Sequence, residues 1–365
     1  MPFADRLPFS RRTWIVVTVA VVASVASAVL RAAIGEGVVV FVTTAVALGG
    51  LAATVGEGTD QLGRRLGPGA TGVLQSALGN LPELFIGFFA LQAGLVSVVQ
   101  AALVGSILAN SLLVLGIAFI AGGLKHGTQS FGSEQTRMMS VLLFLAVAGL
   151  AIPFLATEPG APDAGHQTDL SVIVSVALLV VFVVSIPFSV RGGPGASAAA
   201  REEEDETRWP LSLTIAVVGL AALTAAFVSD WFVESLKPAM GSLGMSEAFA
   251  GLVVVAIAGN AVENVVGIQM ALRNKVDLAV SLILNSSLQV ALALAPVLVL
   301  LSVVLGGTAL TLVLSPLLIG ALILTALLSA LIVVDGQSTW LEGAALVGLY
   351  VIIAASVWWG PAISA

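Results

Sequence analysis

Long apolar runs separated by short polar stretches dominate this chain. A helix needs about 20 apolar residues to cross the hydrocarbon core of a bilayer, and eleven runs approach or reach that length. They lie at residues 13–30, 37–54, 70–92, 97–121, 137–156, 169–190, 210–232, 246–271, 276–302, 308–333 and 340–359. The pattern predicts an all-α polytopic membrane protein with about eleven transmembrane helices.

One short motif occurs twice, each time inside an apolar run. It reads GNLPE at residues 79–83 and GNAVE at residues 259–263. A serine follows the motif glutamate by 23 residues in both halves, as Ser106 and as Ser286. An internal duplication with polar breaks at matching positions is typical of secondary transporters.

The first span has no counterpart in the duplication, so the remaining ten divide into five and five. We expect an N-terminal helix over 1–33, a first repeat over 34–190, a cytoplasmic acidic linker over 191–209 and a second repeat over 210–365. Because five is odd, the two repeats must enter the membrane in opposite directions. The sequence therefore predicts an inverted repeat with broken helices at the bilayer midplane.

Composition supports a membrane protein and narrows its chemistry. Hydrophobic residues make up 58% of the chain, charged residues 10%, and the mean hydropathy is +1.09. There is no cysteine, and both histidines fall in predicted loops, so we expect neither a thiolate nor a histidine metal centre. We also expect no nucleic-acid partner.

Positive charges predict the orientation of the chain. With the N-terminus in the cytoplasm, all of the 14 lysines and arginines except Arg31 and Lys237 fall on the cytoplasmic side. This asymmetry is what the positive-inside rule describes. We expect a multi-pass protein of the cell (inner) membrane with its C-terminus outside.

The repeated motif places polar groups where a helix should break. Pro82 cannot donate to the carbonyl of Leu78, so we expect a kink or a short unwound segment at mid-membrane. The second copy has Val262 in that position, and its break should be milder. Freed carbonyls are tolerated at this depth only where they are buried or line a watery cavity.

An ionisable residue at this depth is by default a functional residue. In each copy an asparagine lies three residues before the glutamate, on the same helical face, and an inverted repeat would bring the two copies together. Carboxylates with neutral oxygens suit a hard divalent cation such as Ca²⁺ and do not suit an anion. The predicted cation ligands are Glu83, Glu263, Asn80, Asn260, Ser106, Ser286, Gln289 and Asn110.

The paired glutamates also offer a means of coupling. Two neighbouring carboxylates in a low dielectric hold protons readily when no cation is present. Cation and proton then compete for Glu83 and Glu263, and exchange follows if only the neutralised site crosses between the two faces. Glu57 and Glu234 form a second matched pair, either as helix-end carboxylates in the interface or as residues of the pathway or its gate.

At these residues the chain resembles the cation/Ca²⁺ exchanger superfamily, and most closely its Ca²⁺/H⁺ antiporter (cation/proton exchanger) branch. The resemblance rests on the two motifs, on GSILAN at 105–110, on RNKVD at 273–277 and on SSLQ at 286–289. It implies exchange of Ca²⁺ for H⁺ with the motif glutamates as central ligands and with no cofactor. The chain has Asn264 where the family usually has histidine, and Asn285 where glycine is usual.

Other functions stay open at the level of sequence. The same scaffold could exchange Na⁺ or K⁺ for Ca²⁺, or Na⁺ for H⁺. A passive cation channel and an intramembrane enzyme are weaker alternatives, and no nucleophile with a neighbouring base is found in the spans. The partners expected are Ca²⁺, H⁺ and the lipid bilayer, and a homo-oligomer stays open.

Overall fold

The computed structural model describes residues 9–66, 78–132, 134–157, 160–161, 165–190, 209–306 and 308–359. The chain forms two compact units, one from residues 1–89 and 186–243 and the other from residues 90–185 and 244–365. Both predicted repeats contribute to both units. The acidic run of the predicted linker lies outside the described residues.

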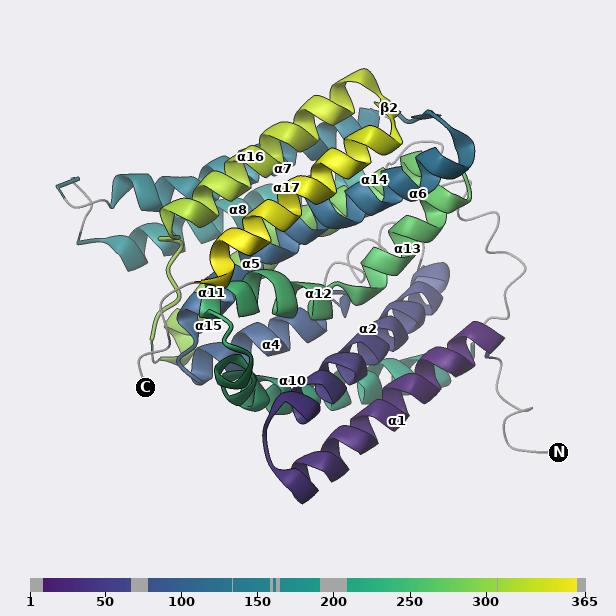
Figure 1. Cartoon of the computed structure of the whole chain (residues 1–365), viewed down its shortest axis with the longest axis vertical. Coiled ribbons are helices and arrows are strands. Elements are labelled where there is room, and N and C mark those ends of the chain that lie inside the picture. The colour runs from purple at the N-terminus through teal and green to yellow at the C-terminus, as the bar shows by residue number, and fades with distance from the viewer. Residues whose placement is uncertain are drawn as a thin grey trace. The chain divides into compact units, whose positions relative to one another are not determined.

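Three long helices build most of the first unit. They are α1 (Arg11–Ile34), α2 (Val38–Leu66) and α10 (Leu211–Leu243), and the unit also holds most of α4 (Leu81–Gln92). Helix α2 packs along both α1 and α10 (Figure 1). The rings of Phe41 and Phe232 stack with their centroids 4.8 Å apart, and Gly50 lets the backbone of α1 come close at Ala20.

The second unit contains the other helices and one small sheet. Its elements are α5 (Val96–Leu108), η2 (Ala109–Val114), α6 (Leu115–His126), β1 (Gln129–Ser130), α7 (Glu134–Ala156), most of α8 (Gln167–Val190), α11 (Glu247–Phe249), η4 (Ala250–Val255), α12 (Ala256–Gly259), α13 (Ala261–Leu272), α14 (Val276–Gln289), η5 (Val290–Leu294), α15 (Ala295–Leu305), α16 (Pro316–Asp335), β2 (Gln337–Ser338) and α17 (Trp340–Trp358). Helix α17 runs beside α6, and α16 beside α7 (Figure 1). The strands β1 and β2 pair antiparallel, with Gln129 opposite Ser338.

Hydroxyl side chains inside the helices hydrogen-bond within their own helix. Ser24, Thr44, Thr54 and Thr325 each donate to the carbonyl four residues earlier, at 2.7–2.8 Å. This satisfies the hydroxyl where no water is available. Such residues therefore stay compatible with membrane spans although they are polar.

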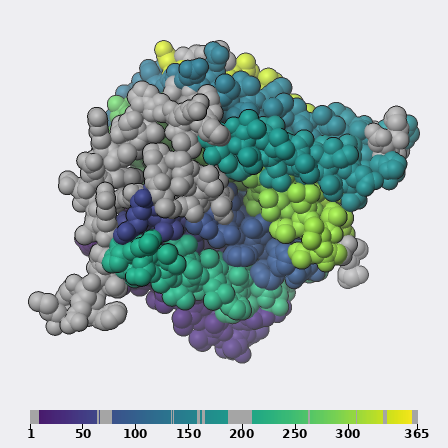
Figure 2. Space-filling model, turned by 180° about the vertical axis from the view of Figure 1, so that it is seen from behind, coloured from purple at the N-terminus to yellow at the C-terminus, as the bar shows by residue number. Residues whose placement is uncertain are grey.

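Apolar side chains are exposed along several helices. On α8 they include Ile173, Val176, Val180, Val183 and Val184, in the teal part of the surface in Figure 2. Exposed apolar stripes of this length suit contact with lipid chains and would be unfavourable in water. The described helices thus fit an integral, multi-pass membrane protein.

The described residues include eight helices long and apolar enough to span a bilayer, or nine if the bent pair 247–259 and 264–272 counts as one span. Two further predicted spans correspond to shorter apolar helices, Leu81–Gln92 and Pro316–Ile332. The predicted total of eleven therefore stays a prediction, because residues 67–77 of the third run lie outside the described residues.

Two predicted spans end too early. The runs 37–54 and 210–232 were limited by polar residues, but α2 continues to Leu66 and α10 to Leu243. Glu57 and Glu234 are therefore inside their helices, nine residues before each end. The predicted ends of these two spans are wrong, because a helix satisfies its backbone whether or not its side chains are apolar.

The predicted span 308–333 begins too early. Residues 308–315 are not helical, and α16 starts at Pro316 with Ser315 as its N-cap. The backbone of this segment is satisfied by side chains instead. Leu310 N–H donates to Ser302 Oγ at 2.8 Å, Leu312 N–H donates to Ser171 Oγ at 3.0 Å, and Gln100 Nε2 donates to the Thr311 carbonyl at 2.8 Å.

Element positions repeat along the chain. Helix α4 begins at residue 81 and α13 at residue 261, and both have 12 residues. Helix α5 begins at residue 96 and α14 at residue 276. A π-helical segment interrupts each of these longer helices, η2 from residue 109 and η5 from residue 290. The duplication seen in the sequence thus extends to the local structure of the described segments.

Candidate functional site

The second copy of the motif sits at a break between two helices. Helix α12 ends at Gly259, Asn260 is not helical (φ −95°, ψ 18°), and α13 begins at Ala261. The segments 247–259 and 264–272 bend by 63° at this break. A proline is therefore not needed for a large bend. Because residues 67–77 lie outside the described residues, the predicted difference between the two breaks stays a prediction.

The side chain of Asn260 holds the broken end together. Its Nδ2 donates to the Ala256 carbonyl at 2.9 Å and to Ser106 Oγ at 2.9 Å. One amide therefore satisfies a carbonyl of α12 and reaches α5 at the same time. The residue is 1% exposed, so these bonds form away from bulk water.

Asn110 binds the same asparagine from the π-helical segment η2. Its Nδ2 donates to Asn260 Oδ1 at 3.1 Å and to Ser286 Oγ at 2.9 Å. Four of the predicted ligands, Asn260, Asn110, Ser106 and Ser286, thus form one buried cluster within the second unit. We call it the amide–hydroxyl cluster. π-helical segments are frequent at functional sites.

A close helix crossing brings these side chains together. A methyl group at Gly105 would collide with the backbone of Leu252 in η4, and one at Gly251 would collide with the Val98 carbonyl in α5. Small residues on both sides therefore let α5 and η4 pack backbone to backbone. This places Ser106, the neighbour of Gly105, within reach of Asn260.

The cluster offers an oxygen that no neighbour uses. Asn110 Oδ1 is fully buried and accepts no hydrogen bond from the described residues. Leaving a buried acceptor without a donor costs about 1–3 kcal/mol. Such an oxygen, beside hydroxyl groups, could serve as a ligand for a hard cation.

One neighbouring pair was missed by the sequence analysis. Ser111 Oγ lies 2.9 Å from Ser287 Oγ, and both side chains are fully buried. They follow Asn110 and Ser286 directly, and Ser287 belongs to the SSLQ segment quoted above. The signal was present in the sequence, but only the fold pairs residues that lie 176 positions apart.

The first copy of the motif lies in the other unit. Asn80 is buried in the turn before α4, and Glu83 lies in the first helical turn with intermediate exposure. Glu263 lies in the first turn of α13, but its side chain is outside the described residues. The predicted meeting of Glu83 and Glu263 therefore stays a prediction. Gln289 is buried at the C-terminal end of α14.

The histidines take no part in the cluster. His126 Nε2 bonds the Leu272 carbonyl at 2.9 Å, and His166 Nδ1 lies 3.2 Å from Asp169. Among the described residues there is no group of three or more histidine, cysteine, aspartate or glutamate residues that could hold a metal ion.

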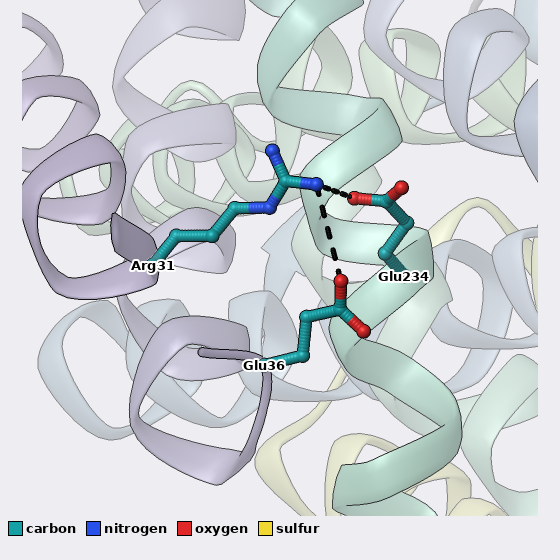
Figure 3. A network of polar contacts seen from close by, with 3 residues as sticks. All are labelled: Arg31, Glu36 and Glu234. Carbon is teal, nitrogen blue, oxygen red and sulfur yellow. Dashed lines mark hydrogen bonds and ion pairs between the residues drawn. The ribbon is translucent and has the colours of Figure 1, made fainter. Parts of the chain in front are cut away.

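Glu234 meets an arginine that comes from outside the duplication. Arg31, in the last turn of α1, donates to Glu234 on α10 and lies 3.9 Å from Glu36 (Figure 3). Its guanidinium also lies 5.7 Å from the ring centroid of Trp231. The side chains of Arg31 and Glu234 are 33% and 39% exposed, so the pair is only partly buried. The sequence analysis did not foresee this partner.

Comparison with known proteins is consistent with this arrangement. The model of the family described as "Sodium/calcium exchanger protein" matches residues 36–191 and 213–359. A protein of Aphanothece halophytica named Ca(2+)/H(+) antiporter is 33% identical over 348 residues, which cover 90% of this chain and 92% of the relative. The protein named Ca(2+)/H(+) antiporter ChaA of Bacillus subtilis (strain 168) is 34% identical over 322 residues, 87% of this chain and 91% of the relative.

Solved structures show a similar fold. The structure titled "Structure of native YfkE" superposes with a TM-score of 0.80 at 32% identity, covering 94% of this chain and 99% of its own. The structure titled "Crystal Structure of H+/Ca2+ Exchanger CAX" is similar in fold, with a TM-score of 0.71 at 18% identity, covering 95% and 92%. With its paired motifs, its apolar helices and this match over most of its length, the chain belongs to the sodium/calcium exchanger protein family.

Proposed function

We propose that this protein is a secondary active transporter that exchanges Ca²⁺ for H⁺ across the membrane by alternating access. The observation that carries the proposal is the buried amide–hydroxyl cluster, with its unused Asn110 oxygen, beside the helix break that precedes Glu263. The relatives named Ca²⁺/H⁺ antiporters support the choice of ions. The family consists of exchangers, which favours transport over the intramembrane enzyme considered above.

The proposed ligands divide into charged and neutral groups. Glu83 and Glu263 supply the charge, and Asn80, Asn260, Asn110, Ser106, Ser286 and Gln289 supply neutral oxygens. In the described structure the amide nitrogens of Asn110 and Asn260 donate to neighbouring oxygens. A bound cation would compete with these donors for Asn260 Oδ1 and the serine hydroxyls. Binding of Ca²⁺ at these oxygens would therefore replace some of the hydrogen bonds within the cluster.

Proton coupling follows from the carboxylates. With Ca²⁺ bound, Glu83 and Glu263 are ionised, and without Ca²⁺ they take up protons because two charges in a low dielectric repel each other. The protein changes between its inward-facing and outward-facing states only when Ca²⁺ or protons neutralise the two carboxylates. With both carboxylates charged and no cation bound, it does not change state. Ca²⁺ and H⁺ therefore move in opposite directions.

We further propose that the two repeats are inverted and that eleven helices span the membrane. The 180-residue spacing of α4 and α13 and of α5 and α14 supports a continuous duplication. Five spans in each repeat then give opposite orientations. The natural absence of cysteine makes single-cysteine labelling a direct test. Probes at Lys125 and Lys275 should be reached from the cytoplasm, and a probe at Lys237 from outside.

The deciding experiment is Ca²⁺ flux into proteoliposomes under an imposed pH gradient, without Na⁺ or K⁺. We expect flux that depends on the gradient and falls to background in Glu83→Gln and Glu263→Gln. Flux that begins only when Na⁺ or K⁺ is added would replace the proposal with Na⁺- or K⁺-coupled exchange. Flux down the Ca²⁺ gradient with no counter-ion would indicate a channel.

Glu57 and Glu234 are proposed as residues of the pathway or its gate. They occupy matching places, nine residues before the ends of α2 and α10. Glu234 forms an ion pair with Arg31. If Glu234 lies on the pathway, it must release the arginine before it can bind a transported cation. Removing the arginine should then change the rate of transport and not the specificity for Ca²⁺.

A further inference from the structure

The C-terminal end of α13 is held by side chains from the α6–β1 segment. Leu272 is the last residue of α13, and its carbonyl accepts hydrogen bonds from Lys125 Nζ at 3.0 Å and from His126 Nε2 at 2.9 Å. The carbonyl of Ala271 accepts from Gln129 Nε2 at 3.2 Å. Backbone groups of the following turn also bond the last carbonyls, with Asn274 N–H donating to Ala271 at 3.0 Å and Lys275 N–H to Met270 at 2.9 Å. The side-chain donors therefore add to the backbone hydrogen bonds that close the end of α13.

The turn after α13 is tied to the same glutamine. Asn274 has a φ of +60°, and among the described residues it is the one residue other than glycine with a positive φ. Its Oδ1 accepts from Gln129 Nε2 at 2.8 Å. A left-handed conformation costs a residue with a side chain about 1–2 kcal/mol. The hydrogen bond to Gln129 offsets part of that cost and gives a reason for asparagine here.

Gln129 itself has little freedom to move. It is 3% exposed, it lies in β1 opposite Ser338 of β2, and a methyl group at Gly122 would overlap its Oε1. The side chain is therefore wedged between α6 and the end of α13. The hydrogen bonds of this confined amide join the α6–β1 segment to the end of α13.

Both ends of α13 are thus tied to one continuous segment. At the N-terminal end, Asn110 of η2 binds Asn260. At the C-terminal end, Gln129 binds Ala271 and Asn274. The segment from η2 through α6 to β1 therefore spans the whole of the 12-residue helix, a length of about 18 Å at 1.5 Å per residue. Glu263 lies in the first turn, between the two ties.

We propose that Gln129 and Asn274 are positioning residues for cation transport, which set the place of Glu263 along α13 relative to Asn110. The inference rests on the proposed function, in which Glu263 is a ligand. The first repeat lacks this arrangement at the matching turn, because Gly94, 180 residues before Asn274, also has positive φ (+74°) but no side chain. The positioning therefore acts on the second copy of the motif.

The test compares variants that keep the backbone of the turn. Asn274→Gly preserves positive φ and removes the acceptor, and Gln129→Met removes the amide with little change of volume. A buried hydrogen bond is worth about 0.5–1.5 kcal/mol, so we expect the Ca²⁺ KM to rise roughly two- to tenfold while kcat changes less than about twofold. Asn274→Asp keeps an acceptor oxygen and should retain the wild-type KM.

A matched control separates positioning from general stability. Thr136 and Ser281 form another hydrogen bond between the β1–α7 region and α14, at 3.2 Å. Ser281→Ala removes this hydrogen bond, which should lower the Tm, and it should leave the Ca²⁺ KM unchanged. A wild-type KM in both Asn274→Gly and Gln129→Met, or a KM that also rises in Ser281→Ala, would overturn the inference.

Hydrogen exchange gives a second readout that does not need transport. Amides of residues 261–272 should exchange faster in Asn274→Gly than in the wild type, whereas those of residues 81–92 should not change. Unchanged exchange in residues 261–272 would show that the hydrogen bonds of Gln129 do not stabilise α13. If the wild type transported no Ca²⁺ but hydrogen exchange still differed between the variants, the proposed function would be wrong. The role of Gln129 and Asn274 in stabilising α13 would then remain supported.

Discussion

The two copies of the repeated segment share a backbone and differ in their side chains. Helices α4 and α13 have the same length, both are followed by a residue with positive φ, and both lead into a helix interrupted by a π-helical segment. The side chains differ at two equivalent positions, however. Asn110 of the first repeat aligns with Val290 of the second, and Gly94 aligns with Asn274. The duplication has kept the backbone geometry of these segments and has changed the side chains at these two positions.

This difference determines which residue is central to the cluster. Asn110 binds both Asn260 and Ser286 from the second repeat, with no equivalent amide at Val290. The first repeat thus contributes the connecting amide, and the second contributes the broken helix that the amide holds. Duplicated transporters need two similar frameworks for alternating access, but an ion site needs only one set of ligands.

The largest expected effect comes from the carboxylates, which both copies retain. Glu83→Gln and Glu263→Gln each leave the site with one charge too few for Ca²⁺, and we expect at least about a 100-fold loss of pH-driven Ca²⁺ flux, since charged partners are worth about 1.5–3 kcal/mol or more. Glu247→Gln, in α11 outside the motif, is the control. Flux that survives in only one of the two variants would show that the copies do not contribute equally.

The next effect should come from making the first copy resemble the second. Asn110→Val removes the connecting amide and leaves Ser286 and Asn260 short of a donor, which should weaken Ca²⁺ binding about 10- to 100-fold at about 1–3 kcal/mol. Calorimetric titration of Ca²⁺ into the purified protein measures it. Val114→Ala, a buried change in the same π-helical segment, is the control. Equal affinity in Asn110→Val and Val114→Ala would remove Asn110 from the site.

A smaller effect is expected for the serine pair beside the cluster. Ser111→Ala leaves Ser287 without its partner, and the free energy of unfolding should fall by about 1 kcal/mol. The double variant Ser111→Ala/Ser287→Ala removes both hydroxyls and should recover part of that loss. Chemical denaturation in detergent measures both, with Ca²⁺ transport as a check. A large change in Ca²⁺ KM would place this pair among the ligands.

The smallest effect is expected for the ion pair between Glu234 and Arg31, a residue outside the duplication. Arg31→Gln and Glu234→Gln break a partly exposed ion pair, which is worth at most about 1 kcal/mol of stability. The Tm should therefore fall by only a few degrees at most. The exchanged variant Arg31→Glu/Glu234→Arg should restore a transport rate that either single reversal lowers. No recovery in the exchanged variant would argue against a specific pairing.

Much of the fold was predictable because its signals are local. An apolar run of about 20 residues forms a helix in lipid whatever its neighbours do, and most predicted spans agree with a described helix to within a few residues. The duplicated motif was visible without structure, and it correctly indicated where the second helix breaks. Four residues predicted as ligands hydrogen-bond to one another in the cluster, and their role as ligands stays a prediction.

Two features depended on partners far away in the chain. The sequence analysis ended α10 too early, since it could not know that Glu234 meets Arg31, 203 residues away. It extended the tenth span into residues 308–315, where Gln100, Ser171 and Ser302 satisfy a non-helical backbone.

The sequence by itself thus determined the membrane class, the positions of most spans and the duplication, and it proposed the residues of the candidate site. The tertiary structure decided which of those residues bind one another, how far the polar helices continue and which turn fixes α13. The physical reason is that apolar length and repeat spacing act within one segment. A buried amide or charge is stable only with a partner, and that partner is chosen by the packing of segments more than 100 residues apart.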